Sequence, residues 1–432
     1  MTSTAGSARP GEADRSVART QAGSDRAFLA LLGVPALGLT FAVTIVSMYL
    51  PVRVISSASP VQVGVLVGGE GFFALFLPTL VGAWTDRTST HVGHRLRFLA
   101  GSAVIAMVAL VVLGAFGGVV VVGISVAVFY IGYYAYLAPY WALYPDLVPR
   151  DETGRSRGAE STWRLVGSAL ATIGGGFLLA VWTPLPFLLA AALVGITTLV
   201  LARGLGDRRD RPLRTSADGW RETLHRQWTL FRQDGVGALL VANALWNFAL
   251  AALRAFVVLF FVIGLGRSTS FVSAVIFPLA AVGFVAAPIS GRLADRIGHI
   301  RVLTVALAVY GGGLLVPAFL HASWLLVLIP VVAAGAATVM TLPYAVLMLL
   351  LEGEVDHGAA SGLFGLSRGI GGLLGPLAVG CAVELTAGNL FDGTRGYGVL
   401  WLIIGVAVLA SLPVLHRVHL VASRPSQSGV PA

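Results

Sequence analysis

Long apolar stretches alternate with short polar ones along almost the whole chain. A transmembrane helix needs about 20 mostly apolar residues. Twelve stretches of this kind can be separated, at 27–52, 60–83, 97–117, 119–145, 158–182, 184–203, 236–264, 270–291, 301–320, 323–350, 358–385 and 397–416. The pattern therefore predicts an all-α membrane protein with twelve transmembrane helices.

The polar segments divide the chain into five parts. We expect a disordered cytoplasmic tail over 1–26, six helices over 27–203, a cytoplasmic linker over 204–235, six helices over 236–417 and a second cytoplasmic tail over 418–432. In the linker, Trp220, Leu224, Trp228 and Phe231 recur at helical spacing with arginines between them. This favours an amphipathic helix on the anionic inner leaflet over a plain solvated linker.

Composition narrows the class of protein. Hydrophobic residues make up 56% of the chain and charged residues 11%, whereas soluble proteins carry about a quarter charged residues. All 29 cationic side chains are arginine. The absence of lysine excludes a P-loop and a pyridoxal-phosphate Schiff base. We therefore predict no enzyme activity, no cofactor and no nucleic-acid partner.

A metal site is not expected either. The single cysteine, Cys381, can form neither an internal disulfide nor a thiolate cluster. His91, His94 and His299 lie in basic turns without the carboxylate or cysteine companions that a metal site requires.

Arginine placement predicts the orientation in the membrane. With the N-terminus inside, 23 arginines fall in cytoplasmic segments, and Arg53, Arg267 and Arg395 fall in outer loops. The positive-inside rule requires such a bias. We therefore expect a plasma-membrane protein with both termini in the cytoplasm.

A charged signature occurs twice. The first copy contains Gly82, Asp86, Arg87, Gly93 and Arg95, and the second contains Gly291, Asp295, Arg296, Gly298 and Arg301. The first copy holds four extra residues between its Asp-Arg and its Gly-His. Further matches keep a constant offset of 204 residues, namely Pro139-Tyr140, Gly154, Arg164 and Gly167 with Pro343-Tyr344, Gly358, Arg368 and Gly371. The chain is therefore predicted to be two six-helix repeats of parallel topology.

Twelve helices with this signature after the second and the eighth resemble the major facilitator superfamily. The lengthened first copy and the run from Tyr144 to Pro149 resemble the glycoside–pentoside–hexuronide cation symporters and the sucrose permeases. The resemblance implies transport by alternating access about a central site. It also implies an inner gate of ion pairs that holds the outward-open state, carried here by Asp86, Arg87, Asp146, Arg155, Arg157, Asp295 and Arg296.

Two positions depart from that branch. The stretch from Phe73 to Pro78 has no carboxylate where melibiose-type members carry paired aspartates for sodium. Trp141 follows Pro139-Tyr140 where sucrose permeases carry an arginine. Neither the sodium site nor that sugar contact can be carried over.

Three charged residues lie at membrane depth and are candidates for ion coupling. Glu70 is ten residues into its helix, which is about 15 Å at 1.5 Å per residue. Arg254 and Arg368 are similarly deep in their helices. The resemblance places the helices at 60–83, 236–264 and 358–385 together. Two interpretations stay open: Glu70 as a proton acceptor, or a static ion pair.

Substrate-binding candidates lie on the helices that line the cavity in this superfamily. They are Thr44, Tyr130, Tyr133, Tyr134, Asn243, Trp246, Asn247, Thr341 and Tyr344. Aromatic faces combined with amide and hydroxyl groups suit a neutral polyol. Polar helix–helix contacts would use the same side chains without binding a solute.

The sequence thus predicts a symporter of a sugar or glycoside coupled to a proton or another monovalent cation. Its partners would be a small-molecule substrate, the coupling cation and membrane lipid. A drug or metabolite efflux antiporter on the same fold remains an alternative. A non-transporting membrane sensor or scaffold is the alternative from another class.

Overall fold

The computed structural model describes the backbone of residues 10–149, 152–213, 220–319, 329–351 and 357–422. The first half contains α1 (Pro10–Val54), α2 (Pro60–Thr88), α3 (Val92–Ala115), α4 (Val119–Leu147), α5 (Thr153–Val181) and α6 (Leu185–Gly204). After α7 (Trp220–Phe231), the second half contains α8 (Val236–Leu259), α9 (Thr269–Ile297), α10 (His299–Phe319), α11 (Ile329–Leu350), α12 (His357–Thr386) and α13 (Val399–Ala422). Within these ranges the regular elements are helices.

The helices match the predicted membrane spans. Among the described residues, 11 helices are long and apolar enough to cross a membrane. The 29 residues of α9 form a further helix at the place of the predicted eighth span. The prediction of an all-α membrane protein with the major facilitator arrangement of helices is confirmed.

Helix α1 begins earlier than the sequence pattern suggested. It starts at Pro10, inside the segment 1–26 that we expected to be disordered. Proline is well suited to the first position of a helix. The backbone of residues 10–26 is therefore helical and continuous with the first span.

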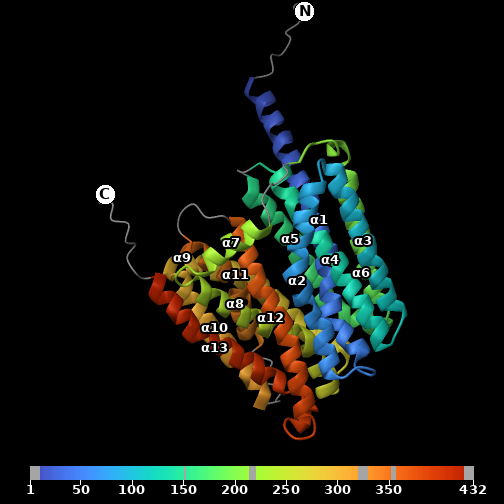
Figure 1. Cartoon of the computed structure of the whole chain (residues 1–432), viewed down its shortest axis with the longest axis vertical. Helices are drawn as coiled ribbons and strands as arrows, with labels where there is room; N and C mark the ends of the chain where they lie inside the picture. The colour runs from blue at the N-terminus through green and yellow to red at the C-terminus, as the bar shows by residue number, and fades with distance from the viewer. Residues whose placement is uncertain (1–9, 150–151, 214–219, 320–328, 352–356, 423–432) are drawn as a thin grey trace, which may run out of the picture.

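The helices form two bundles that stand side by side (Figure 1). In the first bundle, α1 packs against α5 and α6, and α3 packs against α4 and α6. In the second, α8 packs against α12 and α13, and α10 packs against α11 and α13. The bundles meet where α2 contacts α12, α5 contacts α9, and α1 contacts α8.

The two ends of the molecule differ. We call the end that carries α7 the linker end; it lies at the top of Figure 1. The opposite end, which carries the loops 55–59 and 387–398, is called the far end. At the far end, α2 begins with a capping box in which Ser59 and Gln62 satisfy each other's backbone amides.

Glycines allow the two bundles to approach closely along α2 and α12. A Cβ atom on Gly64 would lie 2.5 Å from the carbonyl oxygen of Pro376, and one on Gly380 would lie 2.5 Å from that of Pro60. Such distances are too short for any side chain, so only glycine permits this backbone contact. Because α2 starts and α12 ends at the far end, this seam closes the far half of the molecule.

A second seam joins α5 to α9. A Cβ atom on Gly176 would lie 2.4 Å from the carbonyl oxygen of Thr269. The hydroxyl of Tyr49 on α1 donates to the carbonyl oxygen of Thr172 and lies 3.4 Å from the hydroxyl of Ser273 on α9. The far half is therefore held shut on both sides.

The linker end lacks such close contacts at the corresponding glycines. A Cβ atom added to Gly158, Gly291 or Gly365 would have no heavy atom within 4 Å apart from the neighbouring residues of its own helix. The described bundles are thus closed at the far end and separated at the linker end.

The four extra residues of the first signature copy pair with the linker. His91 forms an isolated antiparallel bridge with Pro212. The amides of Val92 and Gly93 donate to the carbonyls of Arg211 and Arg209, and the amide of Leu213 donates to that of Thr90. The beginning of the linker is therefore fixed to the first bundle.

Filling the α2–α12 seam should open the far end. We expect Gly64→Leu to raise the population of the state that is open at the far end several-fold, because overpacking destabilises the closed state by about 1–3 kcal/mol. The reporter is Ser47→Cys in a Cys381→Ala background, labelled in intact cells with a membrane-impermeant maleimide. Labelling should rise with Gly64→Leu and stay low with Gly101→Leu, whose position has no atom within 4 Å. Equal labelling in both variants would contradict the closed seam.

Candidate functional site

The first signature copy contains a buried ion pair at the linker end. The guanidinium of Arg95 on α3 pairs with the carboxylate of Asp146 on α4, and their side chains are only 1% and 10% exposed. The paired residues belong to neighbouring helices of one bundle. Their contact therefore fixes α3 to α4 rather than one bundle to the other.

The other signature residues lie on the surface of the linker end. Arg155 pairs with Glu152 at 3.8 Å, and Asp295, which is 72% exposed, lies 3.6 Å from His299. The side chains of Arg87, Arg296 and Arg301 are exposed. Gly298 ends α9 with a φ of +99°, and Gly82 has only Ala138 near it, at 3.8 Å. The side chain of Asp86 lies outside the described residues.

The ion pairs formed by the described signature side chains each lie within one bundle and do not join the two. This agrees with the separation of the bundles at the linker end. An inner gate of the kind expected from the resemblance would form only when the linker ends approach. That gate stays a prediction.

The three charged residues at membrane depth line one cavity where the bundles meet. Glu70 of α2, Arg254 of α8 and Arg368 of α12 share it with Ser47, Tyr134 and Asn247. The remaining lining is small or apolar, namely Val67, Gly71, Ala74, Leu250, Ala251, Gly369 and Gly372. Sequence spacing alone placed these charges at similar depth, and the fold brings them together.

The cavity is small. Its volume is about 40 Å³, far below the roughly 300–1,000 Å³ of sites that enclose a drug-sized ligand. This space by itself is too small to enclose a whole sugar. Arg368 is nevertheless exposed, so the open linker end reaches this depth.

The charges in the cavity are not joined by direct ion pairs. Within the part of the chain that the structure describes, Arg254 and Arg368 make neither a hydrogen bond nor an ion pair within 4.0 Å. The hydroxyl of Tyr133 lies within electrostatic range of Glu70 and of both arginines. A direct ion pair was one of the two interpretations of these charges, and none forms among the described residues in this conformation.

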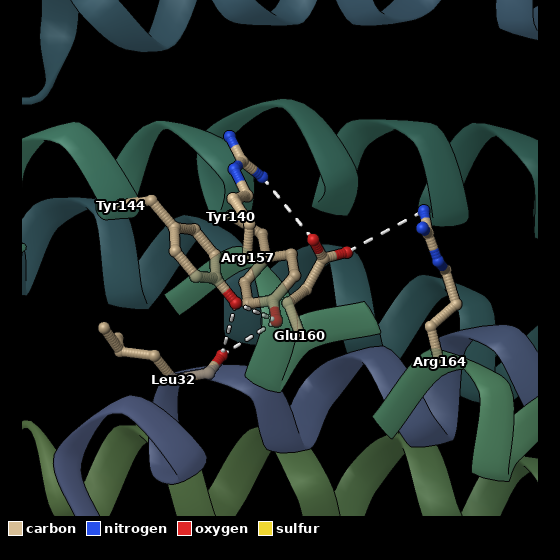
Figure 2. A network of polar contacts seen from close by, with 6 residues as sticks. All are labelled: Leu32, Tyr140, Tyr144, Arg157, Glu160 and Arg164. Atoms are coloured by element: carbon tan, nitrogen blue, oxygen red, sulfur yellow. Dashed lines mark hydrogen bonds and ion pairs between the residues drawn. The ribbon is translucent and has the colours of Figure 1, made fainter. Parts of the chain in front are cut away.

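A second charged cluster lies in the first bundle, nearer the linker end (Figure 2). The buried carboxylate of Glu160 lies 3.5 Å from Arg157 and 4.0 Å from Arg164, all on α5. The guanidinium of Arg157 stacks over the ring of Tyr144 at 4.8 Å. Arg164 is therefore held by a carboxylate of its own helix.

Hydroxyl groups extend this cluster to α1. The hydroxyls of Tyr140 and Tyr144 lie 2.9 Å apart, and they donate to the carbonyl oxygen of Leu32 at 2.8 and 3.2 Å (Figure 2). The indole of Trp163 donates to the carbonyl of Ala30 at 3.0 Å. These contacts tie α1, α4 and α5 together.

Of the nine substrate-binding candidates, Tyr134 and Asn247 line the cavity. Asn243 donates to Ser367 and the indole of Trp246 donates to Ser411, both at 2.7 Å. Thr341 bonds to carbonyls of its own helix, and the ring of Tyr344 packs on Phe364. Thr44, Tyr130 and Tyr133 are buried. Most of the set thus packs helices together in this conformation.

Some contacts had no signal in the sequence. Tyr49 was not a candidate, yet its hydroxyl lies where three helices of both bundles meet. The pairing of the segment 90–93 with 209–213 joins two polar loops whose composition gives no register. Among the described residues, no group of three His, Cys, Asp or Glu side chains could hold a metal ion.

The structure is a helical membrane protein with two bundles and a charged cavity between them. The sequence profile of the Major Facilitator Superfamily matches residues 161–376 and 272–431 of the chain. The chain therefore belongs to that superfamily. This is a family of transporters and not of enzymes. None of the curated proteins compared with the chain matches it.

Solved structures show the same fold. A bacterial homologue of the human lysosomal transporter Spinster, in an inward-facing and unoccupied conformation, aligns with a TM-score of 0.73 and 17% identity over 92% of this chain and 97% of its own. The nucleoside transporter NupG aligns with a TM-score of 0.72 and 15% identity over 92% of this chain and 99% of its own. At these identities the likeness concerns the fold alone. The resemblance to the glycoside and sucrose branch stays a prediction.

Removing the carboxylate beside Arg95 should destabilise the first bundle. We expect Asp146→Asn to lower the unfolding free energy by about 2 kcal/mol, because the charge-assisted hydrogen bond between Arg95 and Asp146 is lost. Thermal unfolding of the purified protein in detergent measures this. The matched control is Asp295→Asn in the second signature copy, whose exposed side chain should matter by less than about 0.5 kcal/mol. Equal effects of the two substitutions would refute a special role for the buried pair.

Proposed function

We propose that the protein is a secondary active transporter that moves a small hydrophilic solute by alternating access and couples this movement to a proton. A sugar or glycoside is the substrate class expected from the sequence. The observation that carries the proposal is the cavity at the junction of the bundles, where Glu70, Arg254 and Arg368 come together.

Alternating access requires a site that is open to one side at a time. The described glycine seams close the far end, and the linker end is separated. With the orientation predicted from the arginines, the linker end faces the cytoplasm. The conformation is then inward-facing, and both termini lie in the cytoplasm of a cell bounded by the plasma membrane.

Proton coupling follows from the charges that face Glu70. The surrounding groups are the two arginines on α8 and α12 and the tyrosines Tyr130, Tyr133 and Tyr134 on α4. An ionised Glu70 attracts the arginines of the second bundle, and a protonated Glu70 does not. Protonation thus changes the interaction between the bundles, which is the requirement for coupling a gradient to a conformational change.

A membrane-surface position of α7 is part of this proposal. The rings of Trp228 and Phe231 stack 5.7 Å apart and are exposed, and Arg232 lies over Trp228 at 4.9 Å. Exposed aromatic rings next to an arginine suit the headgroup region of an anionic leaflet. The buried Gln227 of α7 contacts α12 at Gly362.

Substituting Glu70 with glutamine should separate transport from coupling. We expect Glu70→Gln to lower gradient-driven accumulation at least about tenfold while solute exchange persists, because the proton-binding group is lost but the pathway remains. The measurement uses purified protein in liposomes with an imposed proton gradient. The probes are glucose, sucrose, lactose, gluconate and glucose 6-phosphate.

Glu384→Gln is the matched control, since Glu384 is exposed near the far end of α12. It should leave accumulation unchanged. Unaltered accumulation with Glu70→Gln would show that another group carries the proton. Solute leaving the lumen against its gradient would instead identify an efflux antiporter, and no flux of any probe would favour the sensor or scaffold.

A further inference from the structure

We propose that the transported solute is an organic anion, whose carboxylate or phosphate group binds between Arg254 and Arg368. This rests on the proposed transport function and names the substrate class of the same site. It departs from the neutral polyol that the aromatic and amide residues suggested.

The first observation is the charge balance of the cavity. Its lining contains two guanidinium groups and a single carboxylate. Uncompensated charge at membrane depth is costly and is retained where it has a partner or a function. One positive charge in the cavity therefore remains for an anion even when Glu70 is ionised, and two remain when it is protonated.

The second observation is an asymmetry between the two repeats. Arg164 and Arg368 are equivalent at the offset of 204 residues. Arg164 has the carboxylate of Glu160 on the preceding helical turn. The position equivalent to Glu160 is Phe364, and its ring packs edge-on against Tyr344 at 5.5 Å.

This asymmetry removes the local counter-charge from one arginine. Glu160 already serves two arginines of the first bundle, so it leaves no negative charge for the second. Arg368 is consequently free to meet an anion that enters from the open linker end, and its exposure shows that it can be reached.

The third observation is the chemistry around the two arginines. Guanidinium groups bind carboxylate and phosphate oxygens with paired, charge-assisted hydrogen bonds. The hydroxyl of Tyr134 makes no hydrogen bond with any described residue and lines the same cavity. Ser47 also lines it, but its hydroxyl donates to the carbonyl oxygen of Thr44. Two cations and the hydroxyl donor of Tyr134 suit an acidic group better than a neutral hydroxyl.

The volume of the cavity agrees with this arrangement. About 40 Å³ accommodates an ionic head group, and the rest of the solute would extend towards the linker end. By contrast, Asn243 and Trp246, which a polyol would need, are already hydrogen-bonded to other helices.

The test measures binding to the purified full-length protein by thermal shift at constant ionic strength. The probes are gluconate, glucose 6-phosphate and neutral glucose, so that the carboxylate, the phosphate and the shared carbon skeleton are compared. We expect at least one anion to stabilise the protein and glucose not to do so. Arg254→Gln and Arg368→Gln should each lower the affinity for that anion about tenfold or more.

Two sets of variants control the interpretation. Arg254→Lys and Arg368→Lys keep the charge and should bind more tightly than the glutamine variants, which separates charge from a folding defect. Arg267→Gln removes an exposed arginine outside the cavity and should bind normally. Size-exclusion profiles identify any variant that does not fold.

Three results would overturn the proposal: an equal shift with glucose, anion binding that survives both glutamine substitutions, or no shift with either anion. Proton-driven accumulation of glucose in the liposome assay would remove this inference while leaving the transport function in place. The two proposals can therefore fail separately.

Discussion

Compensation of charge in a low-dielectric environment is the constraint on which this structure depends. A charged group in a membrane-spanning helix needs a partner, water or a function. At the linker end, Arg95 is buried against Asp146. Within the first bundle, Glu160 holds Arg157 and Arg164. Only where the two bundles meet do arginines share a single carboxylate without direct pairs among the described residues.

The charged cavity lies between the two bundles, next to the glycine seams along which the bundles would separate. Backbone contact at Gly64, Gly176 and Gly380 needs no side chain to rearrange when the bundles separate. Opening such a seam breaks few hydrogen bonds, although Tyr49 adds two on the α5–α9 side. Under the proposed coupling, the charges in the cavity would bias the balance between open and closed states. A bound proton or solute can shift it because its own interaction energy is of comparable size.

Much of the fold was predictable because helices in a membrane must satisfy their own backbone hydrogen bonds and are mostly apolar. Hydropathy placed the spans, and the constant offset between repeats revealed the duplication. Helix α1 extends to Pro10 because local helix-forming residues continue beyond the apolar stretch, which hydropathy does not detect.

The site was only partly predictable. Depth along a helix identified Glu70, Arg254 and Arg368, since an intramembrane charge is visible in the sequence. The substrate-binding set was chosen by residue type, but type does not reveal which polar groups are already bonded to a neighbouring helix. Trp246 and Asn243 show this, because Ser411 and Ser367 are distant in sequence. The contact of Tyr49 with Ser273 depends on packing between the repeats, for which the sequence gives no register.

The pairing of residues 90–93 with 209–213 has a mechanical consequence. The linker belongs to the first bundle as far as Leu213, and α7 rests on the second bundle through Gln227 and Gly362. The chain between these two attachments runs only from Leu213 to Trp220, which spans at most about 25 Å when fully extended. The four inserted residues therefore fix the point at which the linker leaves the first bundle to cross to the second.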